Sequence, residues 1–175
     1  MKNFKPLHIG LLTGSCMIAA SLLAFYILKL PIESNFQFIV YGLFTAGIFW
    51  STIQFYKQST AENNFKNIFN AGFKTFVIVA FLMAIFAFVF FSINTGFRDA
   101  KIAENNALIL AEGNHLPSEI EENNKQLKKI FLPIMVSSAM FRYLIIGAII
   151  SAITAGFYSS KNIAGIKKDE ANTVN

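Results

Sequence analysis

The amino-acid sequence predicts an all-α integral membrane protein: a bundle of four transmembrane helices with a helical hairpin projecting between the third and the fourth. Three observations lead to this fold class. The 175 residues are 54% hydrophobic and only 14% charged, whereas a soluble domain carries about 25% charged residues. The charges gather at the ends of four long apolar runs. Each run is long enough to cross a bilayer, which takes about 20 helical residues.

The four predicted spans are residues 7–30, 36–56, 75–93 and 132–158, within one domain that covers residues 1–175. A segment in lipid must satisfy its own backbone hydrogen bonds, so each run should be helical. The first run follows Lys2 and Lys5 and therefore resembles a secretory signal. It exceeds the roughly 7–15 apolar residues of a signal core, so we expect it to be retained as the first span.

The connections between the spans differ in kind. Residues 31–35 should form a tight turn. Residues 57–74 should form a short amphipathic helix that lies at the cytoplasmic interface and leads into the third span, with Thr60 as its N-cap. The projecting hairpin covers residues 94–131. Residues 99–111 should continue the third helix beyond the membrane. After a break at residues 113–117, a new helix should begin at Ser118, because Glu121 follows at capping-box spacing.

The distribution of lysine and arginine predicts that both termini are cytoplasmic. In this orientation eight lysines and three acids lie on the inner side, whereas seven basic residues and seven acids lie on the outer side. The inner lysines are Lys2, Lys5, Lys57, Lys66, Lys74, Lys161, Lys167 and Lys168. The outer basic residues are Lys29, Arg98, Lys101, Lys125, Lys128, Lys129 and Arg142.

Composition and motifs argue against several functional classes. The net charge of +5 does not indicate nucleic-acid binding, because the basic residues flank apolar runs and can serve as topology signals. A lone cysteine, Cys16, cannot form an internal disulfide or a zinc site. His8 and His115 are expected on opposite sides of the membrane. The spans hold no acidic residue, and no nucleotide-binding motif occurs. We therefore predict no catalytic, cofactor-binding or metal-binding residues, and no enzymatic activity.

Small residues recur every four positions in the predicted spans and mark candidate packing surfaces. Such ridges let helix backbones approach closely, which matters because lipid gives no hydrophobic drive between helices. They could pack within one bundle or between two copies of the chain, and the first interpretation is favoured because a monomer already needs these contacts. The packing candidates are Gly10, Gly14, Gly42, Gly147, Ser151 and Ala155.

Arg142 is the only charge well inside an apolar run. An intramembrane charge is a functional candidate by default. However, about 20 residues counted back from Tyr158 place the outer boundary of the last span near Ala139. Arg142 then lies within a turn of that boundary and can extend its guanidinium to the headgroups. An interfacial arginine is therefore favoured over a buried functional one.

The layout resembles a family of small bacterial four-pass membrane proteins, catalogued as domain of unknown function forty-one ninety-nine. The resemblance rests on the four spans, on Phe65, Phe69 and Gly72 before the third span, on Gly10 and Gly14, and on two further features. These are an acidic-then-basic hairpin and the small residues of the last helix. The resemblance covers nearly the whole chain. It implies a location and a fold, and it supplies no catalytic residues.

Three functions remain in competition. The first is a non-enzymatic accessory or interaction subunit of the bacterial inner membrane, whose partners are the lipid bilayer and other membrane proteins or a second copy of itself. The alternative is a small transporter or channel subunit, which needs a polar path. The spans and their ends offer Arg142, Gln54, Asn94 and scattered hydroxyls for one. A membrane-embedded enzyme is the least favoured.

Overall fold

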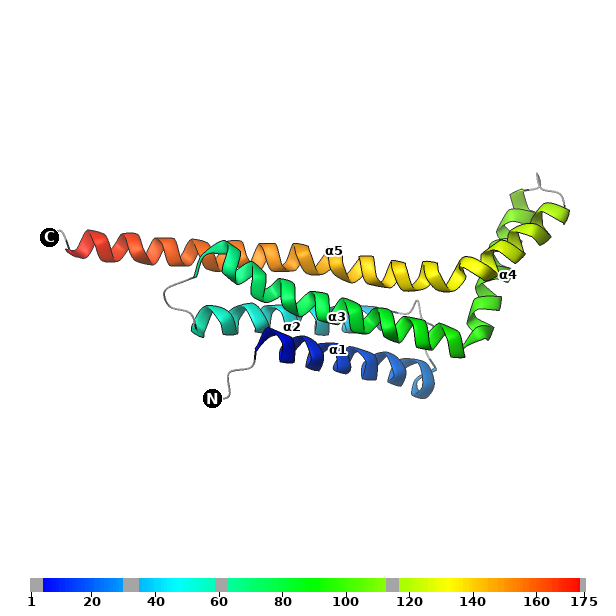
Figure 1. The fold of residues 1–175 in the computed structure, drawn as a ribbon, viewed down its shortest axis with the longest axis horizontal. Helices are drawn as coiled ribbons and strands as arrows, with labels where there is room; N and C mark the ends of the chain where they lie inside the picture. The colour runs from blue at the N-terminus through cyan, green and yellow to red at the C-terminus, as the bar shows by residue number, and fades with distance from the viewer. Residues whose placement is uncertain (1–4, 30–34, 59–62, 113–116, 174–175) are drawn as a thin grey trace. The chain divides into compact units, whose positions relative to one another are not determined.

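The computed structural model describes residues 5–29, 35–58, 63–112 and 117–173, and nearly all of these residues are helical. Figure 1 shows α1 (Pro6–Leu22), α2 (Gln37–Gln58), α3 (Phe65–Ile93), α4 (Thr95–Glu112) and α5 (Pro117–Thr173). All except α4 belong to the four helical segments that are long and apolar enough to cross a membrane. The all-α fold class with four apolar spans is thereby confirmed.

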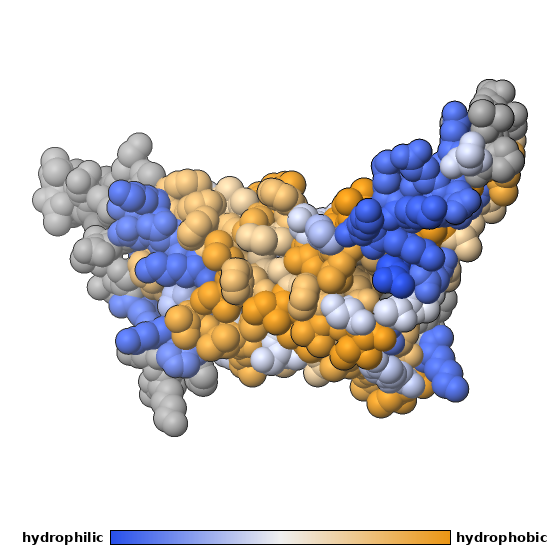
Figure 2. All heavy atoms as spheres, turned by 45° about the vertical axis from the view of Figure 1, so that its right-hand side comes forward, coloured by the Kyte–Doolittle hydropathy of each residue, from blue (hydrophilic) through white to orange (hydrophobic). Residues whose placement is uncertain are grey.

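The chain divides into two compact units. The bundle unit comprises Met1–Leu82 and Phe141–Asn175, so it contains α1, α2, the first part of α3 and the last part of α5. The hairpin unit is Met83–Met140, which contains the end of α3, all of α4 and the start of α5. Figure 2 shows apolar residues over the spans and hydrophilic residues gathered over α4 and the start of α5.

Large apolar side chains fill the interior of the bundle unit. Phe44, Ile48 and Val79 are fully buried, whereas Phe38, Phe81 and Ile153 are largely exposed. Exposed apolar side chains on hydrophobic helices such as α2, α3 and α5 are suited to contact with acyl chains, which solvate them without penalty. Only 17% of the most apolar 18-residue stretch of α5 is buried, so most of the surface of this stretch is available to lipid.

The first span ends in a distorted turn. Residues 23–27 form a π-helical turn after α1, and Leu28 N donates to Leu23 O at 3.0 Å, a bond across five residues. Lys29 then adopts a φ of 51°, the left-handed conformation that commonly terminates a helix. Together α1 and the π-turn give 22 residues, or about 33 Å of helix, enough to cross the hydrocarbon core.

The structure joins the short helix expected before the third span to the span itself. One continuous helix runs from Phe65 to Ile93, and the expected helix begins later than residue 57. Asn64 caps it, because Asn64 Oδ1 accepts a hydrogen bond from Asn67 N at 2.9 Å. The predicted cap Thr60 lies outside the described residues. The phenylalanine spacing arises within this helix, where the rings of Phe65 and Phe69 stack with centroids 5.9 Å apart.

The structure also places a break where the third helix was expected to continue. Helix α3 ends at Ile93 and α4 begins at Thr95. Asn94 separates them, and its Nδ2 donates to Phe90 O at 2.9 Å. An amide side chain that bonds a nearby carbonyl offers the backbone an alternative to the helix ladder. A helical period alone does not reveal such a stop.

Helix α5 is much longer than the predicted span. It covers 57 residues and contains Pro133 in its interior. Proline lacks a backbone N–H, so one helical hydrogen bond is missing there without ending the helix. The predicted new helix begins at Pro117, one residue before Ser118. Figure 1 shows α4 and the first turns of α5 folded back beside each other as a hairpin.

Two tyrosine pairs join α2 to α5. Tyr41 and Tyr143 have ring centroids 6.1 Å apart, and Tyr56 and Tyr158 have theirs 4.8 Å apart. The two pairs have the same sequence offset, so these helices run parallel. Fifteen residues separate the pairs on both helices, so α2 and α5 lie side by side over about 22 Å.

Candidate functional site: a buried hydroxyl cluster in the bundle

A cluster of buried hydroxyl groups lies where three helices of the bundle meet. Thr75 of α3 donates to Ser51 Oγ of α2 at 2.7 Å. Two carbonyl oxygens also lie within hydrogen-bond distance of Thr75 Oγ1: Ala71 O at 3.1 Å and Pro6 O of α1 at 3.2 Å. Ser51 Oγ donates in turn to Ala71 O at 3.3 Å. Thr75 thus connects α3 to both α1 and α2. The oxygen atoms of this cluster lie within hydrogen-bond distance of one another, which leaves no space between them.

Ser151 extends this cluster toward α5 without joining its hydrogen bonds. It is fully buried, and its Oγ has no hydrogen-bond partner among the described residues. A Cβ built on Gly72 would lie 2.5 Å from that oxygen and 3.1 Å from a methyl carbon of Thr52. The absence of a side chain at Gly72 therefore lets α2, α3 and α5 come together at this point.

The neighbouring buried threonines satisfy their hydroxyls within their own helices. Thr52 donates to Ile48 O at 3.0 Å, and Thr154 donates to Ile150 O at 2.7 Å. Back-bonding of this kind is usual for hydroxyl side chains inside membrane helices. These groups therefore act as small packing surfaces, whereas the hydroxyls of Thr75 and Ser51 donate to groups on other helices.

The two predicted packing glycines of α1 both lie against α3. A Cβ on Gly10 would be 3.0 Å from Thr75 O, and one on Gly14 would be 2.6 Å from a methyl carbon of Leu82. Both glycines are buried. Close approach of this kind is possible only where the side chain is absent, so α1 and α3 meet along this glycine ridge.

The predicted candidates of the last helix also lie in the interior. A Cβ on Gly147 would be 2.5 Å from Phe76 Cβ. Ser151, described above, follows one turn later, and Ala155 is fully buried. The three residues therefore form one ridge of α5 that lies against other helices of the same bundle.

Gly42 differs from the other candidates, because it is exposed and a Cβ there would meet nothing within 4 Å. The packing ridge of α2 consists instead of Gly47 and Ser51, both buried. A Cβ on Gly47 would collide with Thr13 of α1. Sequence reasoning missed Gly47, although its four-residue spacing from Ser51 is the same signal as that of Gly42 and Ala46. Spacing identifies a ridge, but not which of two ridges faces a neighbour.

Arg142 directly precedes Tyr143 in α5 and is exposed. Its Nη1 donates to the hydroxyl of Tyr41 at 3.3 Å, a long hydrogen bond. Tyr41 is in the second turn of α2, close to the end of that span. The interfacial position of its guanidinium stays a prediction.

The remaining sequence candidates do not come together. His8 is exposed, His115 lies outside the described residues, and Cys16 is a free, exposed thiol. Among the described residues, no group of three or more His, Cys, Asp or Glu side chains could hold a metal ion. The polar groups that the structure gathers are thus hydroxyls and carbonyls.

Comparison with known proteins gives one result. No curated protein and no solved structure matches the chain. A family model described as a protein of unknown function, DUF4199, matches residues 8–160. This region covers most of the chain. It contains all the glycine and hydroxyl contacts described above except the one made by Pro6. The chain therefore belongs to the DUF4199 family of proteins of unknown function.

Proposed function

We propose that this protein is a non-enzymatic accessory or interaction subunit of the bacterial inner membrane, with both termini in the cytoplasm. In this proposal the bundle anchors the chain, and the hairpin presents a surface to another membrane protein. The observation that carries the proposal is the exposure of two leucines, Leu108 and Leu110, which are each 62% exposed near the end of α4.

These leucines belong to the apolar stretch Ala107–Ala111, which follows the polar residues Glu104, Asn105 and Asn106. Residues two apart point to nearly opposite sides of a helix, so Leu108 and Leu110 make this turn apolar on both sides. A helix that is hydrophobic all round is ordinarily covered by other protein or lipid. Exposed apolar surface rimmed by polar residues is typical of an interaction site.

The interior of the bundle supports an anchoring role. Its polar contacts join helices to one another, as Thr75 does for α1, α2 and α3. Interhelical hydrogen bonds and small-residue contacts stabilise a membrane bundle. The lysine distribution supports the orientation, and the apolar spans support a bilayer location.

The test is purification of tagged protein from membranes in mild detergent, with identification of co-purifying proteins. The informative variant is Leu108→Glu/Leu110→Glu. Its matched control is Ile153→Ala, which changes an apolar residue of the last span that is 66% exposed. We expect at least one protein to accompany the wild type and the control but not the double variant. Identical sets for all three, or solute movement by the purified protein alone in vesicles, would contradict the proposal.

A further inference from the structure

The outer face of α4 is apolar, although the inner face of this helix is apolar as well. Ile102 is buried and Ile109 is partly buried, and residues seven apart share one face of a helix. On the other side of α4, exposed alanines recur every three or four residues. This alanine face consists of Ala100, Ala103, Ala107 and Ala111. A helix that is apolar on both sides is ordinarily covered on both sides, whereas no described element covers the alanine face.

Two leucines flank the alanine face near the end of α4. Leu108 and Leu110 are each 62% exposed. At about 3.6 residues per turn, Ala107 and Ala111 lie in the arc between them. Alanine side chains rise less from the helix than leucine side chains, so the alanines form a shallow strip between two bulkier flanks. Packed helices lie about 8–10 Å apart, depending on the side chains at the contact, and alanines permit the closer approach.

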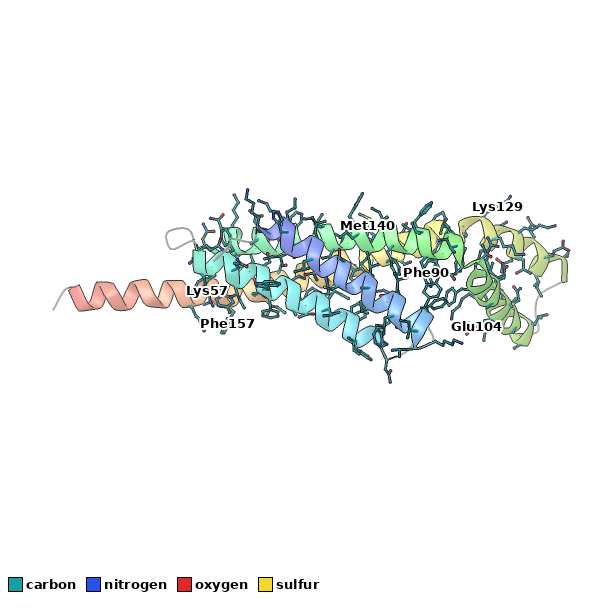
Figure 3. All side chains as sticks on the ribbon, turned by 90° about the horizontal axis from the view of Figure 1, so that it is seen from below. Lys57, Phe90, Glu104, Lys129, Met140 and Phe157 are labelled. Atoms are coloured by element: carbon teal, nitrogen blue, oxygen red, sulfur yellow. The ribbon has the colours of Figure 1, made fainter. Side chains whose placement is uncertain are left out.

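The charge around the alanine face is negative. Glu104 lies on this face, and its carboxylate contacts Lys101 at 3.0 Å while its side chain is 63% exposed. Such an exposed pair contributes little, so another cation can replace Lys101. From Glu104 to Glu122 the chain carries five glutamates and no lysine or arginine. Figure 3 shows Glu104 on α4, whereas Lys129 belongs to α5. This charge attracts a basic partner and repels an acidic one.

Two other occupants fit this face less well than a basic helix. Copies of the chain in one membrane insert in the same direction, so their α4 helices would pair in parallel and bring Glu104 against Glu104. Like charges that face each other are destabilising. A strand needs an open sheet edge, and the described residues contain no strand.

We propose that the alanine face of α4 binds a basic amphipathic helix of the partner protein. The inference rests on the proposed function, in which the hairpin presents a surface to another membrane protein, and it specifies the chemistry of that partner. The apolar residues of the partner helix lie over the alanines and contact Leu108 and Leu110, as apolar anchors do when a helix binds a groove. Its lysine or arginine side chains pair with Glu104.

The experiment uses the full-length protein in nanodiscs of phosphatidylcholine, which carries no net charge. The probes are three synthetic peptides of about five helical turns, each with one photo-reactive leucine. The first has a leucine face and a lysine face, the second has glutamate in place of lysine, and the third is a scrambled form of the first. Mass spectrometry locates the labelled residues after illumination. The test variant is Leu108→Ala/Leu110→Ala. Its matched control is Ile149→Ala/Ile153→Ala, which removes exposed apolar groups from α5.

We expect the basic amphipathic peptide to label α4 about tenfold more than the other two peptides. Labelling of α4 should fall about tenfold for each leucine truncated, stay at the wild-type value in the control, and weaken in 1 M salt because the charges are then screened. Equal labelling of α4 by the basic and acidic peptides would overturn the proposal. So would unchanged labelling in the test variant, absence of label on α4, or covalent dimers of the protein in place of peptide adducts.

The peptides replace the native partner, so this result is separate from the test of the proposed function. If the basic peptide labels α4 but no protein accompanies the chain from membranes, the proposed function fails and the binding face stands. If proteins accompany the chain but the peptide does not label α4, the proposed function stands and this inference fails.

Discussion

The bundle unit and the hairpin unit differ in the side chains that make their closest contacts. In the bundle, glycines meet hydroxyl or aromatic side chains, as Gly72 meets Ser151 and Gly147 meets Phe76. The helices approach one another most closely where a glycine has no Cβ. Backbones that approach this closely gain dispersion contacts and can be joined by hydroxyl hydrogen bonds.

The hairpin unit relies on larger groups. The ring of Phe91 lies 5.5 Å from that of Phe97 and 6.0 Å from that of Phe131, measured between centroids. Charged side chains pair on its exposed surface. Phe97 and Phe131 lie outside the predicted spans, where water drives apolar side chains together, whereas lipid does not. Removing bulk should therefore damage the hairpin, whereas adding bulk should damage the bundle.

The largest expected effect is overpacking of the bundle. Gly147→Leu should destabilise the protein by about 1–3 kcal/mol, because a Cβ at this position already lies 2.5 Å from Phe76. The matched control is Gly42→Leu on α2, where a Cβ meets nothing within 4 Å. Thermal unfolding in mild detergent measures both. If the two variants unfolded at the same temperature, the contrast between packed and lipid-facing glycines would fail.

A smaller effect should separate two buried serines. Ser51→Ala removes the acceptor of the 2.7 Å bond from Thr75 and should cost about 0.6–1.7 kcal/mol, the range of interhelical hydrogen bonds in membranes. Ser151→Ala removes a buried hydroxyl whose oxygen has no partner among the described residues. It should be neutral or stabilising, because no hydrogen bond is lost. Equal losses in unfolding temperature would show that Ser151 has a hydrogen-bonding role.

Substitution of Arg142 should have a still smaller effect. Arg142→Lys should be nearly silent, because lysine also extends to the headgroups. Arg142→Leu should be mild, because a more apolar segment inserts more readily, and the bond that it loses to Tyr41 is 3.3 Å long and exposed. Expression level and unfolding temperature in lipid provide the measurement. Clear loss in both variants would make Arg142 a buried functional group.

The smallest effect should come from a surface ion pair of the hairpin. Lys125 and Glu121 are 2.9 Å apart, and each side chain is 71% exposed. Water and salt screen such pairs, so they contribute little to stability. Glu121→Gln should leave the unfolding temperature unchanged within error. A measurable loss would indicate that surface charge holds the hairpin together, contrary to the comparison drawn above.

Hydropathy and helix length predicted the four spans, because the bilayer imposes both on any chain that crosses it. The break at Asn94 was missed, because a helical period does not reveal a side-chain hydrogen bond such as that from Asn94 Nδ2 to Phe90 O. The helical spacing of Phe65, Phe69 and Phe73 predicted a helix that leads into the third span, but it did not show that this helix begins only at Phe65.

The candidate site was predicted less completely than the fold. Four-residue spacing found Gly10, Gly14 and Gly147, but it chose Gly42 over Gly47. The bond between Thr75 and Ser51 joins residues 24 positions apart. No local pattern records such a pairing, because it depends on how the helices are rotated against one another.

The central proposal is that the four apolar helices cross the bilayer with both termini in the cytoplasm and with residues 94–131 outside it. Reporter fusions placed after Gln58, at Asn114 and at Asn175 test this most directly. The account predicts cytoplasmic signals after Gln58 and at Asn175, and an external signal at Asn114. A cytoplasmic signal at Asn114 would contradict it.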